Sequence, residues 1–397
     1  MAPLLSIDEA RANVLAAVTP LEAEAISVAD ALGRVLAEEL VAAGDVPPFA
    51  NSAMDGFLVT AGPAGRTLTV SGESRAGHPA DAAPQEGEAV RISTGALVPP
   101  GGEAVVPIER IAFNEDGTIT LNAAAEPGQH IRHAGEDVTR GTTLLPPGTV
   151  FGPAEVGAAV IAGRAHVQAA RRPRLSIVAT GDELVPPGRP LGPGQIHESN
   201  GMTLGALADQ AGADVLVRAH VKDTPAATRS ALEHALTRSD VIIASGGVSV
   251  GPHDHVKGAL DDLGVEQRFW RVALRPGKPT WFGVRDGTLV FGLPGNPVSA
   301  MVTFLLFVRP ALAKLQGADP SRTRVRARLT EPLPRLPGRD EAVRVMLAHT
   351  DAGRTATPTG PQGSHQLTSM IAADGLAILT AGDTVAEAGT ELDVELI

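Results

Sequence analysis

The chain has 397 residues, of which 43% are hydrophobic and 20% are charged, and its formal net charge at pH 7 is −12. A chain of this length is too long for one compact core, so roughly two to four domains of an ordinary globular protein are expected. The negative charge argues against a nucleic-acid-binding protein, because phosphate backbones require clustered Lys and Arg. Cysteine is absent, which excludes disulfides, thiolate catalysis and thiolate metal ligands and is compatible with a cytoplasmic protein.

No segment predicts a signal peptide or a membrane span. The N-terminus does not combine a basic start with an apolar core. The longest apolar helix is expected to begin at Val298 and to stop at Arg309-Pro310, which is shorter than the ~18 residues that a span requires. We therefore expect no contact with a membrane.

The first 170 residues predict helices that flank a small β domain. Ser6 and Glu9 have the spacing of a capping box and predict a helix that continues to Val18, and a second helix is predicted over residues 28–36. Consecutive prolines at 47–48 then break the chain. Short apolar runs separated by turn residues predict strands at 67–70, 89–92, 104–107 and 118–121. A helix over 153–162 is expected to rejoin the N-terminal helices, so that the β domain is an insertion.

The remainder of the chain predicts a doubly wound α/β domain followed by a β domain. Strands at 175–179, 215–217, 241–244 and 288–291 alternate with helices at 200–211 and 228–236 and with the helix that begins at Val298. Later strands at 324–329, 342–347, 376–379 and 391–396 predict a C-terminal β barrel or sandwich. The predicted domains are a helical part at 1–48 and 138–170, an inserted β domain at 49–137, the α/β domain at 171–318 and the C-terminal β barrel at 319–397.

Three Gly-rich turns in the α/β domain predict an anion-binding cleft. They are Ser245 to Gly251, Arg275-Pro276-Gly277-Lys278-Pro279 and Gly292-Leu293-Pro294-Gly295-Asn296-Pro297. The first follows a buried strand and the third connects a strand to a helix, an arrangement that directs backbone N–H groups and a helix N-terminus at an anion. Prolines on both sides restrict the turn that carries Lys278; the alternative is that Lys278 is an ordinary surface lysine.

Carboxylates are predicted near these turns, because ligands bind beyond the carboxyl ends of the strands in an open α/β sheet. Asp182, Glu183, Asp223 and Asp254 all follow predicted strands. Carboxylates beside a phosphate-binding turn indicate an intervening divalent cation, and oxygen ligands favour Mg²⁺. Three alternatives stay open: Asp223 caps a helix, Asp182 stabilises its own turn, and His253 and His255 ligate a metal.

Taken together, these segments resemble the molybdopterin molybdenumtransferase family, known as MoeA in bacteria and as the E domain of gephyrin in animals. The matching segments occur in the family's order over nearly the whole chain: Asn51 to Gly56, Ser93 to Ala96, Gly135 to Asp137, Thr180 to Leu184, Ser199-Asn200, Ser245 to Gly251 with Asp254, Pro276 to Pro279, Gly292 to Pro297, and Gly363 to His365. The resemblance implies an elongated, four-part subunit and a homodimer whose active site draws on both chains. It also implies contacts with the proteins that supply and adenylylate molybdopterin.

The activity that the resemblance implies is insertion of molybdate into adenylylated molybdopterin, with release of AMP and with Mg²⁺ as the divalent ion. Lys278 and Arg275 would bind phosphate or molybdate, and Glu183, Asp223 and Asp254 would hold the metal or position water. Catalytic Asp55 and substrate-binding Thr94 would come from the inserted domain, on the partner subunit. The substrate-binding residues would further include Gly181, Gly246, Gly247, Ser249, Pro294, Gly295 and Asn296, together with Arg344, Ser364 and His365 on the molybdate side.

Some positions depart from the family pattern, and three alternatives stay open. Members commonly have Asp-Asp where this chain has Asp223-Thr224, an aromatic residue where it has His255, and lysine where it has Arg275. A non-catalytic molybdopterin-binding scaffold is one alternative, but no long disordered linker is visible in the sequence. A related pterin adenylyltransferase would explain residues 171–318 alone, and a preference for tungstate over molybdate leaves no trace in the sequence.

Overall fold

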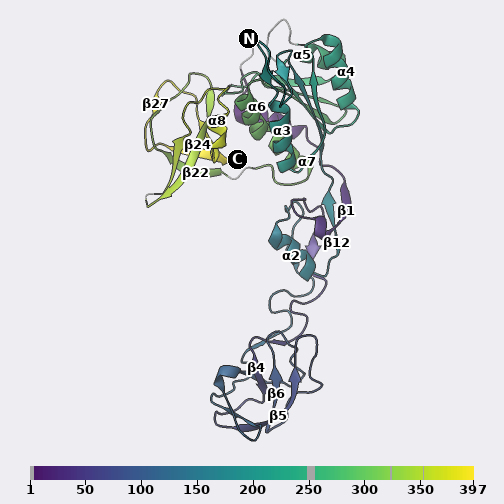
Figure 1. The fold of residues 1–397 in the computed structure, drawn as a ribbon, viewed down its shortest axis with the longest axis vertical. Helices are drawn as coiled ribbons and strands as arrows, with labels where there is room; N and C mark the ends of the chain where they lie inside the picture. The colour runs from purple at the N-terminus through teal and green to yellow at the C-terminus, as the bar shows by residue number, and fades with distance from the viewer. Residues whose placement is uncertain (1–3, 248–254, 322–323, 352) are drawn as a thin grey trace. The chain divides into compact units, whose positions relative to one another are not determined.

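The computed structural model describes residues 4–247, 255–321, 324–351 and 353–397. The chain forms two compact units (Figure 1). The larger unit comprises residues 1–24, 33–37 and 169–397, and the smaller unit comprises residues 25–32 and 38–168. The chain passes between the units four times: within strand β1 (Ala23–Ser27), before residue 33, after residue 37, and within strand β12 (His166–Ala170).

The smaller unit is built on a six-stranded sheet in the order β7-β4-β6-β5-β9-β8. Its strands are β4 (Gly56–Val59), β5 (Thr67–Ser74), β6 (Glu88–Ile92), β7 (Ala104–Pro107), β8 (Ile111–Phe113) and β9 (Ile119–Leu121). All four strands predicted in this region are present. Apolar side chains from alternate strand positions, among them Phe57, Leu68 and Val106, form its buried core.

Short elements complete the smaller unit. Strand β2 (Leu40–Val41) pairs with β11 (Thr143–Leu145), and β3 (Asn51–Ser52) pairs with β10 (Ile131–Arg132). Helix α2 (Pro153–Ile161) forms as predicted, with Pro153 in its first turn. A 3₁₀ helix, η2, occupies Ile108–Arg110.

The helix predicted over residues 28–36 is wrong. Only a 3₁₀ helix, η1 (Val28–Asp30), forms there. Gly33 follows with a φ of 74°, a left-handed conformation that ends helical structure. Leu36 is then in an extended segment that bridges Ala169, so a pairing distant in sequence overrides the local helical composition.

The larger unit contains the predicted α/β sheet, with six strands in the order β16-β13-β17-β21-β20-β18. The strands are β13 (Arg174–Thr180), β16 (Asp214–Val221), β17 (Val241–Ser245), β18 (Glu266–Trp270), β20 (Trp281–Arg285) and β21 (Thr288–Leu293). The first four in sheet order are parallel, whereas β20 and β18 extend the sheet in antiparallel fashion. The sequence did not predict these two.

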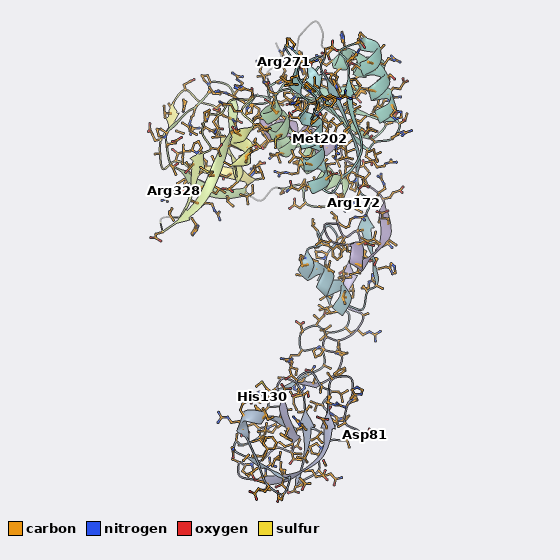
Figure 2. The ribbon with its side chains drawn as sticks, viewed as in Figure 1. Asp81, His130, Arg172, Met202, Arg271 and Arg328 are labelled. Atoms are coloured by element: carbon orange, nitrogen blue, oxygen red, sulfur yellow. The ribbon has the colours of Figure 1, made fainter. Side chains whose placement is uncertain are left out.

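Helices cover both faces of this sheet, so the domain is doubly wound. Alternate residues of β17 point into different cores: Val241 and Ile243 into one, Ile242 and Ala244 into the other. The helices are α1 (Ile7–Ala16), α3 (Asn200–Gln210) and the helix at 297–315 on the first face, and α4 (Pro225–Leu236) and α5 (Val256–Asp262) on the second. Helix α3 buries Leu204 and Ala208 but exposes Met202 (Figure 2).

The predicted end of the long apolar helix is wrong. It continues through α6 (Pro297–Thr303), a π-helical segment (η3, Phe304–Val308) and α7 (Arg309–Leu315). Pro310 is tolerated because it lies in the first turn of α7, directly after the π-helical segment, where a missing N–H is least costly. By length and composition alone this helix could cross a membrane, but 78% of its most apolar window is buried inside the fold, as expected for a core helix.

The C-terminal residues form the predicted β barrel. Its strands are β22 (Arg324–Leu329), β24 (Asp340–Thr350), β25 (Gly353–Pro358), β26 (Gly375–Leu379) and β28 (Glu391–Leu396). They pair in the order β24-β25-β22-β28-β26, and β26 pairs back onto β24 and closes the barrel. Strand β19 (Leu274–Arg275) joins the outer side of β24 in parallel, so that Arg275 lies opposite Glu341. The Lys278 turn therefore begins at the barrel.

Short elements flank the barrel and the sheet of the larger unit. They are β14 (Leu184–Val185) paired with β15 (Ile196–His197), β23 (Leu333–Pro334) paired with β27 (Val385–Ala386), and helix α8 (Thr368–Ile371).

Asp240 fixes the start of the α/β domain. Its carboxylate accepts hydrogen bonds from Arg171 at 2.7 and 3.1 Å and from the Arg174 backbone N–H at 2.8 Å. Burial opposes ionisation, but the hydrogen bonds from Arg171 and Arg174 outweigh it and lower the pKa of Asp240 from 3.8. The stability that the carboxylate contributes is therefore present above pH 3.8 and is lost as the pH falls through the lowered pKa.

We predict that Asp240→Asn lowers the free energy of unfolding at pH 7 by about 1–2 kcal/mol. The free energy of unfolding is measured by urea unfolding followed by tryptophan fluorescence, because Trp270 and Trp281 both lie in this sheet. The matched control is Asp262→Asn: Asp262 is 70% exposed and 3.8 Å from Arg229, so a change below about 0.5 kcal/mol is expected. Equal effects of the two substitutions would contradict the prediction.

Candidate active site

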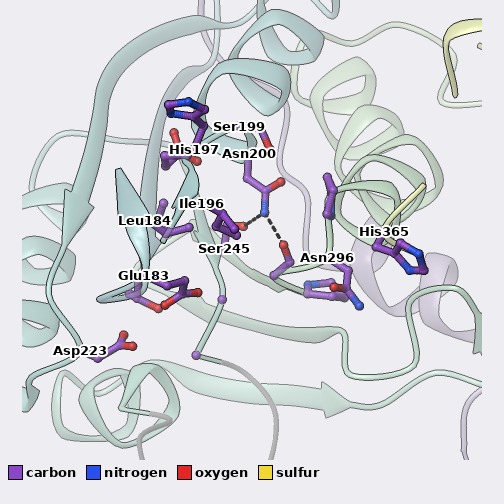
Figure 3. Close-up of a pocket in the computed structure, with 18 of the residues that line it drawn as sticks. Glu183, Leu184, Ile196, His197, Ser199, Asn200, Asp223, Ser245, Asn296 and His365 are labelled. Carbon is purple, nitrogen blue, oxygen red and sulfur yellow. Dashed lines mark hydrogen bonds between the residues drawn. The ribbon is translucent and has the colours of Figure 1, made fainter. Parts of the chain in front are cut away.

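A cavity of about 740 Å³ opens at the carboxyl ends of the parallel strands (Figure 3). It is reached by the residues that follow β13, β17 and β21 and by the first residue of α3, Asn200. The position agrees with the general rule for open α/β sheets. The sequence-predicted site residues that line it are Glu183, Asp223, Gly246, Gly247, Pro294, Gly295, Asn296 and His365.

Glycine is required at the turn after β17 for steric reasons. Gly246 and Gly247 have φ angles of 85° and 65°. A Cβ atom at Gly246 would lie 2.8 Å from the Thr180 carbonyl oxygen, and one at Gly247 would lie 2.6 Å from Val256. The turn therefore presents bare backbone to the cavity.

The backbone N–H groups that were expected to bind an anion are partly occupied. The Gly246 N–H donates to the Leu293 carbonyl at 3.2 Å, and the Val298 N–H, in the first turn of α6, donates to the Ser364 carbonyl at 3.2 Å. Pro297 has no N–H. The helix N-terminus is thus bonded to the barrel, and anion binding at this site depends more on side-chain cations than the sequence suggested.

Two carboxylates face the cavity from one side, Glu183 after β13 and Asp223 before α4 (Figure 3). The alternative that Asp223 caps α4 is wrong, because the cap is Thr224, whose hydroxyl accepts from the Ala227 N–H at 3.3 Å. Asp182 accepts from the Asp223 backbone N–H at 3.3 Å and so orients that residue. The sequence could not distinguish Asp223 from Thr224, since both residue types favour caps.

Ser249, His253 and Asp254 lie in 248–254, outside the described residues. Within the described part of the chain, no group of three His, Asp or Glu side chains is placed to hold a metal ion. Glu183 and Asp223 nevertheless supply the oxygen donors that a hard divalent cation prefers.

A second cavity of about 400 Å³ adjoins the first and carries the basic residues. Pro279, Pro294, Asn296 and His365 line both cavities. The other predicted site residues in its wall are Arg275, Lys278 and Ser364. The Asn296 side-chain amide donates to Ser364 Oγ at 2.9 Å and links the α/β domain to the barrel at the boundary between the cavities.

The turn that carries Lys278 has a fixed backbone. Gly277 has a φ of 122°, and a Cβ there would lie 2.6 Å from Thr303. Thr280 Oγ1 donates to the Gly277 carbonyl at 2.6 Å, and the Val272 N–H donates to the Lys278 carbonyl at 3.0 Å. Lys278 is exposed and takes part in none of the ion pairs that the described residues form. Its charge is therefore available to an anion in the second cavity.

Arg344 is completely buried and does not line either cavity. Burial lowers its pKa to about 10. Its guanidinium donates to Ser369 Oγ at 3.2 Å and to the Gly363 carbonyl at 3.3 Å. This geometry favours a positioning role: Arg344 holds the loop that presents Ser364 and His365 to the second cavity.

Glu341 lies beneath the basic residues of the second cavity and was not predicted from the sequence. It is 7% exposed, and its carboxylate lies 3.6 Å from Arg275 Nε. Burial raises the pKa of Glu341, and the positive charges of Arg275, Arg344 and Arg339 oppose that rise. The pKa of Glu341 is higher in the folded protein than in the unfolded chain, so the protonated carboxyl stabilises the fold. This contribution is present below pH 4.5 and is lost as the pH rises through the raised pKa.

We predict that anion affinity in the second cavity falls as the pH rises through the pKa of Glu341, because its ionisation adds a negative charge beside Arg275. Glu341→Gln should tighten molybdate binding at pH 7 by roughly three- to tenfold and flatten the pH dependence. Calorimetric titration with molybdate between pH 5 and 8 measures both effects. The control is Asp351→Asn at an exposed hairpin turn; an unchanged pH profile in Glu341→Gln would overturn the prediction.

Asp55 and Thr94 lie in the smaller unit and contact each other. Asp55 Oδ1 accepts from the Thr94 backbone N–H at 2.7 Å, so the carboxylate caps the Ser93-Thr94-Gly95 turn. Gly181, which precedes Glu183 in the larger unit, has its carbonyl 2.8 Å from His220 Nε2. The roles implied for Asp55, Thr94 and Gly181 stay predictions.

Thr180 and Asn200 were not among the predicted site residues, although both line the first cavity. The structure gives Ser199 no side-chain capping bond and turns the Asn200 amide to the cavity (Figure 3).

Three family models match the chain: "MoeA N-terminal region (domain I and II)" over residues 5–163, "Probable molybdopterin binding domain" over 176–314, and "MoeA C-terminal region (domain IV)" over 326–397. The molybdopterin molybdenumtransferase of Haemophilus influenzae is 36% identical over 96% of this chain and 98% of its own length. Molybdopterin molybdenumtransferase 2 of Mycobacterium tuberculosis is 39% identical over 93% and 94%. A solved molybdopterin biosynthesis MoeA protein from Pyrococcus horikoshii superposes with a TM-score of 0.83 at 28% identity, covering 99% of this chain and 100% of that one. The chain belongs to the MoeA family of molybdopterin molybdenumtransferases.

Proposed function

We propose that the chain inserts molybdate into adenylylated molybdopterin and releases AMP, which completes the molybdenum cofactor. The observation that carries the proposal is the joined pair of cavities: carboxylates Glu183 and Asp223 line one, cations Arg275 and Lys278 line the other, and Asn296 lines both. A substrate that carries a phosphoanhydride and a dithiolene at separate positions would span two such sites.

The reaction balances without an oxidant. Water cleaves the phosphoanhydride and releases AMP. Two Mo–S bonds then form while one oxo ligand of molybdate leaves as water with the two thiol protons, so molybdenum stays hexavalent. Lys278 and Arg275 would bind the tetrahedral oxyanion, while Ser364 and His365 would orient it from the barrel. The chain has no cysteine to compete with the pterin thiolates.

Glu183 and Asp223, with Asp254, would hold Mg²⁺, and when bound the ion would neutralise the phosphates of the substrate. Asp223 is kept in place by Asp182 at its backbone N–H. The carboxylates would otherwise repel the phosphates, which is the physical reason to expect a cation between them.

The proposal is tested by AMP release from adenylylated molybdopterin with purified protein and Mg²⁺, with and without molybdate. We expect release that depends on molybdate and is lost in Asp223→Asn. Tight binding of the adenylylated pterin without AMP release would indicate a scaffold instead, and stronger activation by tungstate would indicate a tungstate-preferring enzyme.

We also propose a homodimer that shares its active sites. The smaller unit exposes apolar side chains on and near α2: Val150 is 53%, Val160 59% and Ile161 52% exposed, as expected of a subunit interface. The test is complementation: a mixture of Asp55→Ala and Lys278→Ala chains should recover activity if each site takes Asp55 from one chain and Lys278 from the other. Contacts with supplying and adenylylating proteins, and the cytoplasmic location, stay predictions.

A further inference from the structure

Asn200, which lines the first cavity, has a side-chain amide held in a fixed orientation. The residue is 8% exposed, and its Nδ2 donates to Ser245 Oγ and to the Gly295 carbonyl, both at 2.8 Å (Figure 3). The Gly295 carbonyl can only accept, so the amide cannot be reversed without placing two oxygens together. Asn200 Oδ1 has no partner although it is buried.

Thr180, the last residue of β13, supplies a second unpartnered group in the same cavity. It is 7% exposed, and its Oγ1 is buried without a hydrogen bond. A Cβ atom at Gly246 would lie 3.2 Å from this hydroxyl, and one at Gly247 would lie 3.0 Å from it. A side chain at either glycine would therefore crowd this hydroxyl.

The chemistry of these atoms specifies a ligand. Asn200 Oδ1 can only accept, so its partner must present an N–H or O–H group, and the Thr180 hydroxyl can accept or donate. An unpaired buried polar atom is costly, which gives a complementary ligand an advantage over one that lacks the donor. Two apolar residues, Leu184 and the 55% exposed Ile196, line the same cavity and offer a surface for a planar ring.

We infer that Asn200 Oδ1 and Thr180 Oγ1 recognise the amino edge of a heterocyclic ring. The inference rests on the proposed function, because both ring systems of adenylylated molybdopterin, the adenine and the pterin, carry an exocyclic amine. Replacement of that amine by hydrogen removes the donor and leaves Asn200 Oδ1 unpaired. These two residues are therefore specificity determinants within the first cavity.

The test uses two ligand pairs that differ only in the presence of the amine: AMP against purine riboside 5′-monophosphate, and 6-hydroxymethylpterin against its 2-deamino analogue. Binding is measured by calorimetry with the full chain and Mg²⁺. We expect the amine-bearing member of one pair to bind about tenfold more tightly; the pair that shows the preference identifies which ring occupies the site. Equal binding within both pairs would overturn the inference.

Variants separate recognition from folding. Thr180→Val keeps the shape and removes a hydroxyl that has no bond in the fold, so it should reduce the preference several-fold without a change in the unfolding temperature, whereas Thr180→Ser should retain it. Asn200→Leu should abolish the preference. An undiminished preference in both Thr180→Val and Asn200→Leu would refute the assignment. AMP release from adenylylated molybdopterin is a separate readout: its absence with the preference intact rejects the proposed function alone.

Discussion

Lys278→Ala is expected to lower kcat/KM for molybdate-dependent AMP release by about 10²–10³-fold, the usual effect of removing a charged group that stabilises a reacting anion. Lys278 extends from a turn that Gly277 and Thr280 hold rigidly, and no ion pair of the described residues occupies it. Arg275, in contrast, shares its charge with Glu341 at 3.6 Å. Lys278 is therefore the stronger oxyanion ligand of the two.

The measurement is AMP release over a range of molybdate concentrations. Lys278→Arg keeps the charge and should retain part of the activity. Arg328→Ala removes a cation from an exposed position on barrel strand β22, 3.5 Å from Glu391 (Figure 2), and should leave the activity unchanged. A Lys278→Ala variant that releases AMP at the wild-type rate with unchanged molybdate dependence would show that the second cavity does not bind the oxyanion.

Local sequence patterns were enough to predict most of the fold. The run Val241-Ile242-Ile243-Ala244 predicts a strand buried on both faces, and the structure pairs it with β13 and β21 between two layers of helices. The Ser6 and Glu9 spacing predicts a capping box that the structure contains. Predictions failed at residues 28–36, where contacts with residues distant in sequence determine the backbone conformation. They also failed at Pro310, where a π-helical segment allows the helix to continue past a proline.

Residues of the candidate site could be named from the sequence where they lie in one turn or directly follow a strand, as Glu183 and Asp223 do. Gly246, Gly247 and Lys278 stand out because glycine and proline leave recognisable patterns. Glu341 and Asn200 do not, because their roles depend on partners far away in the sequence: Glu341 meets Arg275 through the β19–β24 pairing, and Asn200 is oriented by Ser245 and Gly295. Arg344 is buried and does not line the second cavity. The sequence contains no pattern from which the burial of a single arginine can be predicted.

The second large effect is expected on stability, in Glu395→Ala. Glu395, on β28, is 1% exposed, and its Oε1 accepts from Arg11 of α1 at 2.7 Å and from Arg324 of β22 at 2.9 Å. Arg11 also donates to the Leu306 carbonyl at 3.2 Å. The carboxylate thus connects the N-terminal helix, the barrel and the long core helix. Among the described residues, its removal leaves Arg11, which is 14% exposed, with the exposed Asp8 at 3.7 Å as its remaining countercharge.

Removal of one partner from a buried ion pair typically costs ~3–5 kcal/mol, and the 45% exposure of Arg324 places this pair near the lower figure, about 3 kcal/mol. Urea unfolding measures the loss, and hydrogen exchange in α1 localises it. Glu395→Gln, which keeps an acceptor, should lose less. The matched control is Glu391→Ala on the same strand: Glu391 is 47% exposed and 3.0 Å from Arg326, so a change below about 0.5 kcal/mol is expected. Equal losses at Glu395 and Glu391 would mean that α1 is held by its apolar face alone, through Ile7, Ala10 and Val14.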